Sequence, residues 1–152
     1  MKLSTRVRYG CRAMVDLAQR EGDGPVPLDD LAEEQHIPRR YLAKILQDMR
    51  RAGLIRSLRG AGGGYELDVD PRQTTLRDVW EALEGPFRPV ECLERPAGCD
   101  MVEECVTRDV WAEMAETLNR VLESVTVAGL AQRHAKKVED GSGDGEKEGA
   151  RR

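Results

Sequence analysis

Apolar side chains recur at helical spacing between Pro38 and Gly53. The positions are Leu42, Ile45, Leu46 and Met49. One face of a helix is therefore apolar, with proline suited to its first turn and glycine to a left-handed cap after its end. Leu54-Ile55 is a short apolar run, residues 59–64 are rich in glycine, and Tyr65-Glu66-Leu67 alternates as a strand does. This order predicts a recognition helix followed by a β wing.

Further helices are predicted on both sides of this segment. Ser4 or Thr5 caps a helix that runs to about Gln19, and Pro27-Leu28 opens a short helix to about Gln35. After the wing, helices are expected from Thr74 or Thr75 to Glu84, from near Thr107 onwards, and from a Thr126 cap to about Ala135. The predicted fold class is mainly α with a small β wing, a winged helix-turn-helix domain followed by a long dimerisation helix.

Four regions follow from this pattern. We expect a winged helix-turn-helix DNA-binding domain over 1–85, a cysteine-containing cluster-binding loop over 86–106, and a dimerisation helix with a short C-terminal helix over 107–135. The remainder, 136–152, has no apolar period and is expected to be disordered.

Composition supports a helical, cytoplasmic protein. Only 4% of the 152 residues are aromatic and 39% are hydrophobic, so the core must consist mainly of aliphatic side chains. No apolar run approaches the roughly 18 residues that span a bilayer. The first ten residues also lack the apolar stretch of a signal peptide. We therefore expect no membrane partner.

Positive charge gathers locally in a chain whose net charge is −4. Between His36 and Gly60, seven Arg and Lys residues stand against one acid, Asp48. Such a patch is typical of a surface that binds a polyanion, although a solvated helix face is the alternative. The predicted DNA contacts are Arg39, Arg40, Tyr41, Lys44, Arg50, Arg59, Gly60 and Gly62.

The long helix near the C-terminus carries a heptad-like seam. Its members are Trp111, Met114, Leu118, Val121 and Val125. Ala115 and Leu122 are expected to widen this seam. Operator-binding helix-turn-helix proteins are commonly two-fold dimers, so we interpret it as a homodimer interface. Packing against the chain's own domain is the alternative.

Three of the four cysteines lie in a segment that glycine and proline keep from being helical. Cys92, Cys99 and Cys105 are separated by six and five residues. Structural zinc sites use closer pairs. Three thiolates on one loop can hold an iron–sulfur cluster, and three unrelated reduced thiols are the alternative. The fourth, Cys11, is expected to be a buried small apolar residue.

Several motifs together resemble one family. They are residues 1–4 leading into Arg8-Tyr9-Gly10, Tyr41-Leu42, 51–55, the glycine-rich 59–65, the three cysteines and 125–128. The chain resembles the winged helix-turn-helix regulators typified by the iron–sulfur cluster regulator IscR and the nitric-oxide sensor NsrR. The resemblance implies a homodimer on a palindromic operator in double-stranded DNA, with a 2Fe-2S or 4Fe-4S cluster held by Cys92, Cys99 and Cys105.

The chain departs from that family in its cluster ligands. The first two cysteines are one residue farther apart than usual, Arg108 replaces a ligand histidine, and Arg8 replaces a ligand aspartate. The fourth ligand is therefore open. The candidates are Cys11, Glu103, Glu104 and Asp109.

The sequence favours a DNA-binding transcriptional regulator, expected to be a repressor that senses redox, nitric oxide or iron–sulfur status. A cluster-free, thiol-based regulator of the same fold is the alternative. An enzyme is disfavoured, because Gly62-Gly63-Gly64 lacks the Lys-Ser/Thr of a phosphate-binding loop. His36 and His134 also fall in a turn and near the tail, where no catalytic triad is suggested.

Overall fold

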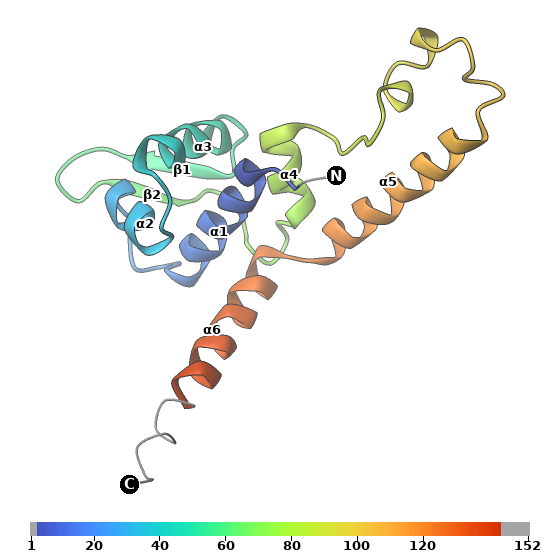
Figure 1. The fold of residues 1–152 in the computed structure, drawn as a ribbon. Coiled ribbons are helices and arrows are strands. Elements are labelled where there is room, and N and C mark those ends of the chain that lie inside the picture. Colours follow the sequence, from blue (N-terminus) through green and yellow to red (C-terminus); the bar gives the residue numbers. More distant parts are fainter. Residues whose placement is uncertain (1–2, 144–152) are drawn as a thin grey trace, which may run out of the picture.

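The computed structural model describes residues 3–143, and their first half is a helix-turn-helix followed by a hairpin (Figure 1). The elements are α1 (Thr5–Gln19), α2 (Leu28–Glu34), α3 (Arg39–Arg51), β1 (Ile55–Leu58) and β2 (Gly64–Leu67). The predicted order of helix, strand, glycine turn and strand is confirmed. So is the fold class, which is mainly helical with one small antiparallel sheet.

We call the packed unit built on this helix-turn-helix and hairpin the body. The second half of the chain adds one helix to the body, leaves it, and returns to it with the start of the last helix. The elements are α4 (Leu76–Glu84), the 3₁₀ turns η1 (Glu91–Leu93) and η2 (Pro96–Gly98), α5 (Val106–Ser124) and α6 (Val127–Gly143). In Figure 1, α5 projects from the body and the segment that carries η1 and η2 lies beyond its far end. We call α5 and residues 86–105 the arm. No helix in the described part of the chain is both long enough and apolar enough to cross a membrane.

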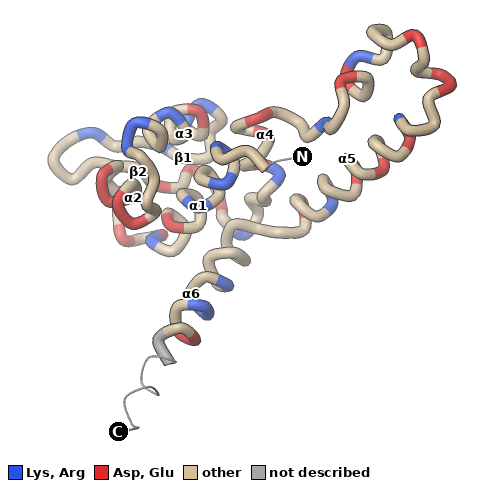
Figure 2. Tube along the Cα trace, in the orientation of Figure 1, with Lys and Arg blue, Asp and Glu red and all other residues tan. Residues whose placement is uncertain are grey.

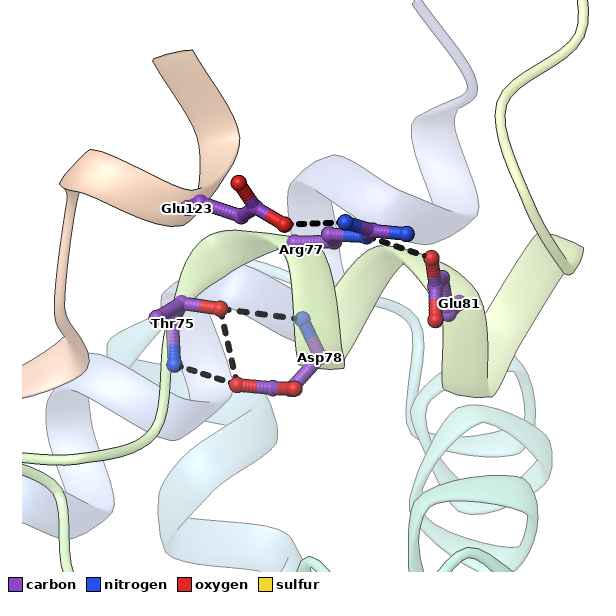
Figure 3. A network of polar contacts seen from close by, with 5 residues as sticks. All are labelled: Thr75, Arg77, Asp78, Glu81 and Glu123. Atoms are coloured by element: carbon purple, nitrogen blue, oxygen red, sulfur yellow. Dashed lines mark hydrogen bonds and ion pairs between the residues drawn. The ribbon is translucent and has the colours of Figure 1, made fainter. Parts of the chain in front are cut away.

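Local capping explains where several helices begin and end. The Ser4 hydroxyl accepts the Arg6 N–H at 3.2 Å, and Thr75 forms a capping box with Asp78 at the start of α4 (Figure 3). Gly53 and Gly85 follow the ends of α3 and α4 with φ of 77° and 76°. Glycine adopts this left-handed conformation without the steric cost that other residues bear.

The apolar stripe of α3 packs in the middle of the body. Its four predicted inward positions are at most 1% exposed, which confirms the periodicity. They belong to one core cluster that α1, α2, α4, the hairpin, the segments beside these elements and the first residue of α6 complete. Its members are Val7, Ala13, Met14, Leu17, Val26, Leu31, Ala32, Ile37, Leu42, Ile45, Leu46, Met49, Leu54, Ile55, Val79, Trp80, Leu83 and Val127.

The wing is attached to the body by a third short extended segment. Val26 and Tyr65 exchange two backbone hydrogen bonds, each 2.8 Å long. A Cβ at Gly64 would lie 2.4 Å from the Val26 carbonyl group, so glycine permits this close approach. The hairpin register pairs Ile55 with Leu67 and therefore holds the glycine turn away from the body.

The last helix is longer than predicted. α6 continues to Gly143, so the expected end near Ala135 and the expected disorder are wrong over 136–143. The Thr126 hydroxyl accepts the Gly129 N–H at 3.1 Å, and Val127 is fully buried. Once a helix has been nucleated in this way, each further residue costs little. Residues 144–152, the rest of the predicted disordered tail, lie outside the described residues.

Candidate nucleic-acid interface and cysteine loop

The face of α3 opposite the core carries most of the predicted DNA contacts. The exposed side chains are Arg39, Arg40, Tyr41, Lys44 and Arg50. Figure 2 shows Lys and Arg gathered along α3 and in the loop between β1 and β2. This surface of α3 and the wing turn is called the basic face below.

Ion pairing divides the cations of the basic face into two groups. Arg39 pairs with Asp29, Arg50 donates to Ser57 Oγ at 3.1 Å, and other acids hold Arg51 and Arg56. The second group has no ion pair and no side-chain hydrogen bond within residues 3–143. Its members are Arg40, Lys44 and Arg59. These three charges can bind an anion without first breaking an internal contact.

The wing turn is tight and exposed. Arg59, Gly60 and Gly62 are all exposed, and Gly60 has a φ of 107° that favours glycine. A Cβ at Gly63 would meet the Leu58 carbonyl oxygen at 2.3 Å. The glycine-rich sequence is thus required by the turn itself, which begins with the exposed Arg59 directly after β1.

A tyrosine pair braces the first turn of α3 against α1. The rings of Tyr9 and Tyr41 meet edge to face, with their centroids 5.9 Å apart. The Arg12 guanidinium lies 5.6 Å from the centroid of the Tyr9 ring and donates to the Gln35 side chain at 3.1 Å and to its carbonyl. Sequence reasoning missed Tyr9 and Arg12 here, although their spacing of three places both on one face of α1.

Polar contacts with α1 also hold the turn between α2 and α3 in place. Asp16 is only 3% exposed, and its carboxylate accepts hydrogen bonds from Gln35 and Arg20, both 2.8 Å long. His36 in this turn has a φ of 51°, which is uncommon for a residue other than glycine. The orientation of α3 is therefore fixed by polar contacts in addition to its apolar stripe.

The arm leaves apolar side chains on the surface. Trp111, Met114 and Val121 are 38%, 37% and 54% exposed. Together with Leu118 and Phe87 they line grooves along α5, one of about 510 Å³. In the described chain the predicted seam is therefore mainly a surface feature of α5.

Other residues that were expected in the seam pack within the chain instead. Ala115 is buried and Leu122 packs against the core, so the expectation that they widen the seam is wrong. Val125 lies just after α5, and its carbonyl accepts the Leu76 N–H at 2.9 Å. The Val127 N–H donates to the Thr74 carbonyl at the same distance, so these backbone bonds join the α5–α6 junction to the start of α4.

A charged side chain on α4 also connects α4 to the end of α5. Arg77 on α4 donates to Glu81 at 2.6 Å and also to Glu123 near the end of α5 (Figure 3). These acceptors stabilise the charged guanidinium and raise the pKa of Arg77. No local pattern predicts the contact with Glu123, because the two residues are 46 positions apart.

Two of the three loop cysteines share a cavity. Cys92 in η1 and Cys99 after η2 line a space of about 400 Å³ together with Arg95. Cys105 precedes α5, where its Sγ lies 3.3 Å from Thr107 Oγ1. Within residues 3–143, no group of three or more His, Cys, Asp or Glu side chains is placed to hold a metal ion. The structure thus brings Cys92 and Cys99 together and leaves Cys105 apart.

The thiols differ in acidity. The Thr107 hydroxyl and then the Arg108 backbone N–H stabilise the thiolate of Cys105 and lower its pKa. Cys11 on α1 is partly buried against the core, where a fully buried side chain was predicted, and this burial raises its pKa to about 11. Arg108 Nε is buried without a hydrogen-bond partner among the described residues. The other proposed fourth ligands, Glu103, Glu104 and Asp109, are exposed.

Known proteins match almost the whole described chain. A profile of the Rrf2 family, described as iron-dependent transcriptional regulators, matches residues 3–133. The regulator CymR of Bacillus subtilis is 39% identical over 131 residues, which cover 86% of this chain and 90% of the relative. The protein rrf2 of Nitratidesulfovibrio vulgaris is 41% identical over 130 residues, which cover 86% and 87%.

Solved structures agree with these sequence matches. The structure of B. subtilis CymR, described as the global cysteine regulator, has a TM-score of 0.73 at 36% identity and covers 88% of this chain and 98% of that one. The IscR of T. potens also gives a TM-score of 0.73 at 36% identity, with 88% of each chain covered. The curated CymR and IscR relatives are named as transcriptional regulators and not as enzymes. The chain belongs to the Rrf2 family of transcriptional regulators.

Proposed function

We propose that this regulator acts in the cytoplasm as a homodimeric repressor that binds a palindromic operator through the basic face and senses its signal through the cysteine loop. The observation that carries the DNA-binding role is the set of unpaired cations Arg40, Lys44 and Arg59 on α3 and the wing. A helix that presents unpaired cations beside a protruding glycine turn matches the geometry of a recognition helix in a major groove with a wing on the adjacent backbone.

The proposed contacts follow from this geometry. Arg40 and Lys44 lie in the first turns of α3, the part of a recognition helix that usually reaches base edges. Arg59, at the start of the wing turn, would reach phosphate or the minor groove. The backbone at Gly60 and Gly62 can approach the duplex closely because these residues have no side chain. Tyr41, Arg39 and Arg50 complete the proposed surface.

The exposed seam of α5 supports a second copy as the partner. Trp111, Met114 and Val121 would lose their contact with water in a two-fold helix pair, joined by Leu118 and flanked by Val125. Two basic faces held in this way would bind two half-sites of a palindrome.

We infer that the loop holds an iron–sulfur cluster through Cys92, Cys99 and Cys105. The donor set fits, because all three are thiols on one loop and two of them already line a single cavity. A bound cluster would supply redox and nitric-oxide reactivity. The part of this chain would be to order a loop that contains glycine and proline, with Cys105 at the start of α5 linking the loop to the proposed dimer helix.

The DNA-binding proposal is tested by substituting the unpaired cations. Duplexes selected from a random pool by the wild-type protein serve as probes, and affinity is measured over a range of salt concentrations. Arg59→Ala should weaken binding to every sequence and reduce the salt slope by about one unit. Arg40→Ala should also relax the sequence preference. Arg133→Ala on α6, an exposed arginine away from α3, is the control and should bind normally. Wild-type affinity of the Arg40→Ala, Arg59→Ala double variant would overturn the assignment.

The cluster is tested by iron and sulfide content per subunit after reconstitution without oxygen. Cys92→Ala, Cys99→Ala and Cys105→Ala should each abolish binding. Cys11→Ala removes a thiol of the body and should retain it. Full iron occupancy in Cys99→Ala, or none in the wild type, would count against the cluster.

A thiol switch without a cluster is the second candidate. The observation that favours it is that Cys92 and Cys99 line one cavity that Cys105 does not line. In this case peroxide would oxidise the two thiols to a disulfide and be reduced to water. Mass spectrometry of the oxidised protein would detect a Cys92–Cys99 crosslink, and its absence together with a full complement of iron would exclude this candidate.

A further inference from the structure

An acid on α2 holds the first arginine of α3. Arg39 Nε donates to Asp29 Oδ1, and the two side chains are 61% and 70% exposed. Asp29 lies in the first turn of α2, while Arg39 is the first residue of α3. A pair this exposed contributes little to folding. The dipole of α2 accounts for an acid at this position, as it does for Asp30, but not for the contact of Asp29 with the guanidinium of α3.

The atoms used by the pair restrict how Arg39 can bind anything else. A guanidinium presents five N–H donors in a planar fork. It can meet an acceptor pair end-on through its two terminal nitrogens, or side-on through Nε and one terminal nitrogen. Asp29 occupies Nε, and the terminal nitrogens have no partner within the described residues. Only the end-on approach remains open.

Guanine offers the acceptor pair that this fork matches. Its O6 and N7 accept a bidentate arginine in the major groove, which is the commonest specific contact between proteins and DNA. A phosphate can be met from many directions, and the Asp29 carboxylate repels it. An arginine held by an acid therefore favours a base edge over the backbone. Arg40, the next residue, has no acid partner and is free to bind either.

On the basis of the DNA-binding role proposed above, we propose that Asp29 is a positioning residue that determines specificity. It fixes Arg39 for a guanine in each half-site and lowers the affinity of the basic face for DNA of unrelated sequence.

Substitution of Asp29 should separate these two effects. Asp29→Asn keeps the shape of the side chain and releases Arg39, so affinity for unrelated sequences should rise and the salt slope should steepen by about one unit. Asp30→Asn is the matched control. It removes the same charge from the same helical turn, and Asp30 is exposed with no ion pair among the described residues. It should leave both the slope and the base preference unchanged.

The experiment selects duplexes from a random-sequence pool with the wild-type protein and the variants Asp29→Asn, Asp30→Asn, Arg39→Ala and Arg39→Lys. Each protein is then titrated with the wild-type consensus duplex and a scrambled duplex over a range of salt. We expect one guanine per half-site to be selected by wild type and Asp30→Asn. Discrimination at that base should fall about fivefold or more in Asp29→Asn and in both Arg39 variants. Arg39→Lys keeps the charge without the planar fork, so its salt slope should match the wild type even though the guanine preference is lost.

A double variant shows whether Asp29 acts through Arg39. Asp29→Asn should have no further effect in an Arg39→Ala background. Equal shifts in Asp29→Asn and Asp30→Asn would mean that Asp29 contributes charge alone, and retention of the guanine in Arg39→Ala would remove its proposed target. Either result would overturn the inference while DNA binding itself stands. If the wild-type protein selects no consensus, the proposed DNA-binding function fails as well.

Discussion

The body and the arm differ in how far they bury their apolar side chains. In the body, large apolar residues such as Leu42 and Met49 are fully buried, and the Asp16 carboxylate is satisfied by two donors. In the arm, Trp111 and Val121 remain 38% and 54% exposed. The body is thus complete within one chain, whereas the arm carries apolar surface that a single chain does not cover. We infer that the body sets the DNA-binding geometry and that the arm provides the sites where a partner or a signal acts.

The largest effect that tests this comparison is loss of a core side chain. Leu42→Ala removes a fully buried side chain and should lower the free energy of unfolding by about 2–5 kcal/mol. Val110→Ala on the arm, where the side chain is 57% exposed, should change it by less than about 0.5 kcal/mol in dilute protein. Urea denaturation of both variants measures the difference. Equal losses would show that the arm belongs to the same core.

The second test places a charge in the seam. Leu118→Glu would put an unpaired carboxylate between two copies of α5, which is strongly unfavourable. Dimers should dissociate in sedimentation, operator affinity should collapse, and far-ultraviolet circular dichroism should remain that of a folded body. Arg133→Glu on α6 adds an acid to an exposed helix and serves as the control. An intact dimer of Leu118→Glu would place the seam outside the interface.

The body was more predictable from sequence than the arm, because its elements are encoded locally. The stripe of α3 and its flanking Pro38 and Gly53 lie within sixteen consecutive residues, so periodicity and capping rules suffice. The glycine turn is likewise dictated by close backbone contacts of Gly63 and Gly64. The end of α6 was missed because residues 136–143 have no apolar period, although a nucleated helix continues through them.

The features of the site that could not be predicted depend on contacts between side chains from different elements of the fold. A basic run identified the face, but only the structure separates Arg40 and Lys44, which are unpaired, from Arg39, which Asp29 holds. The spacing of the cysteines likewise indicated a shared site without giving its geometry. Cys92 and Cys99 line one cavity because η1 and η2 fold the loop back on itself. Cys105 instead lies immediately before α5.

The third test compares the thiols of the two regions. Burial raises the pKa of Cys11 to about 11, so its thiolate fraction near pH 8 should be about a hundredfold below that of a thiol at the ordinary value of 9.0. The hydrogen bond from Thr107 lowers the pKa of Cys105, so its thiolate fraction should exceed the ordinary one. Alkylation of the metal-free, reduced protein, followed by mass spectrometry, should therefore be fastest at Cys105 and slowest at Cys11.

The pH dependence of alkylation sharpens this contrast. As the pH rises, the rate at Cys105 should level off first, while the rate at Cys11 should still increase above pH 10. Thr107→Val removes the hydroxyl that donates to the Cys105 thiolate. The alkylation rate of Cys105 should then rise at higher pH than in the wild type. Identical profiles for Cys105 in the two proteins would show that the hydroxyl has no influence on the thiol.

The smallest expected effect lies at the junction of body and arm. Arg77 bridges α4 to α5 through Glu123 (Figure 3). The two side chains are 36% and 49% exposed. Loss of such an exposed pair should lower the free energy of unfolding only slightly. Hydrogen exchange is the sharper measurement, because Arg77→Ala should speed exchange in the last turn of α5 while the amides of α1 stay protected. Glu81→Ala removes only the partner within α4 and is the matched control. If neither variant changes exchange in α5, the backbone bonds of Val125 and Val127 alone hold the arm to the body.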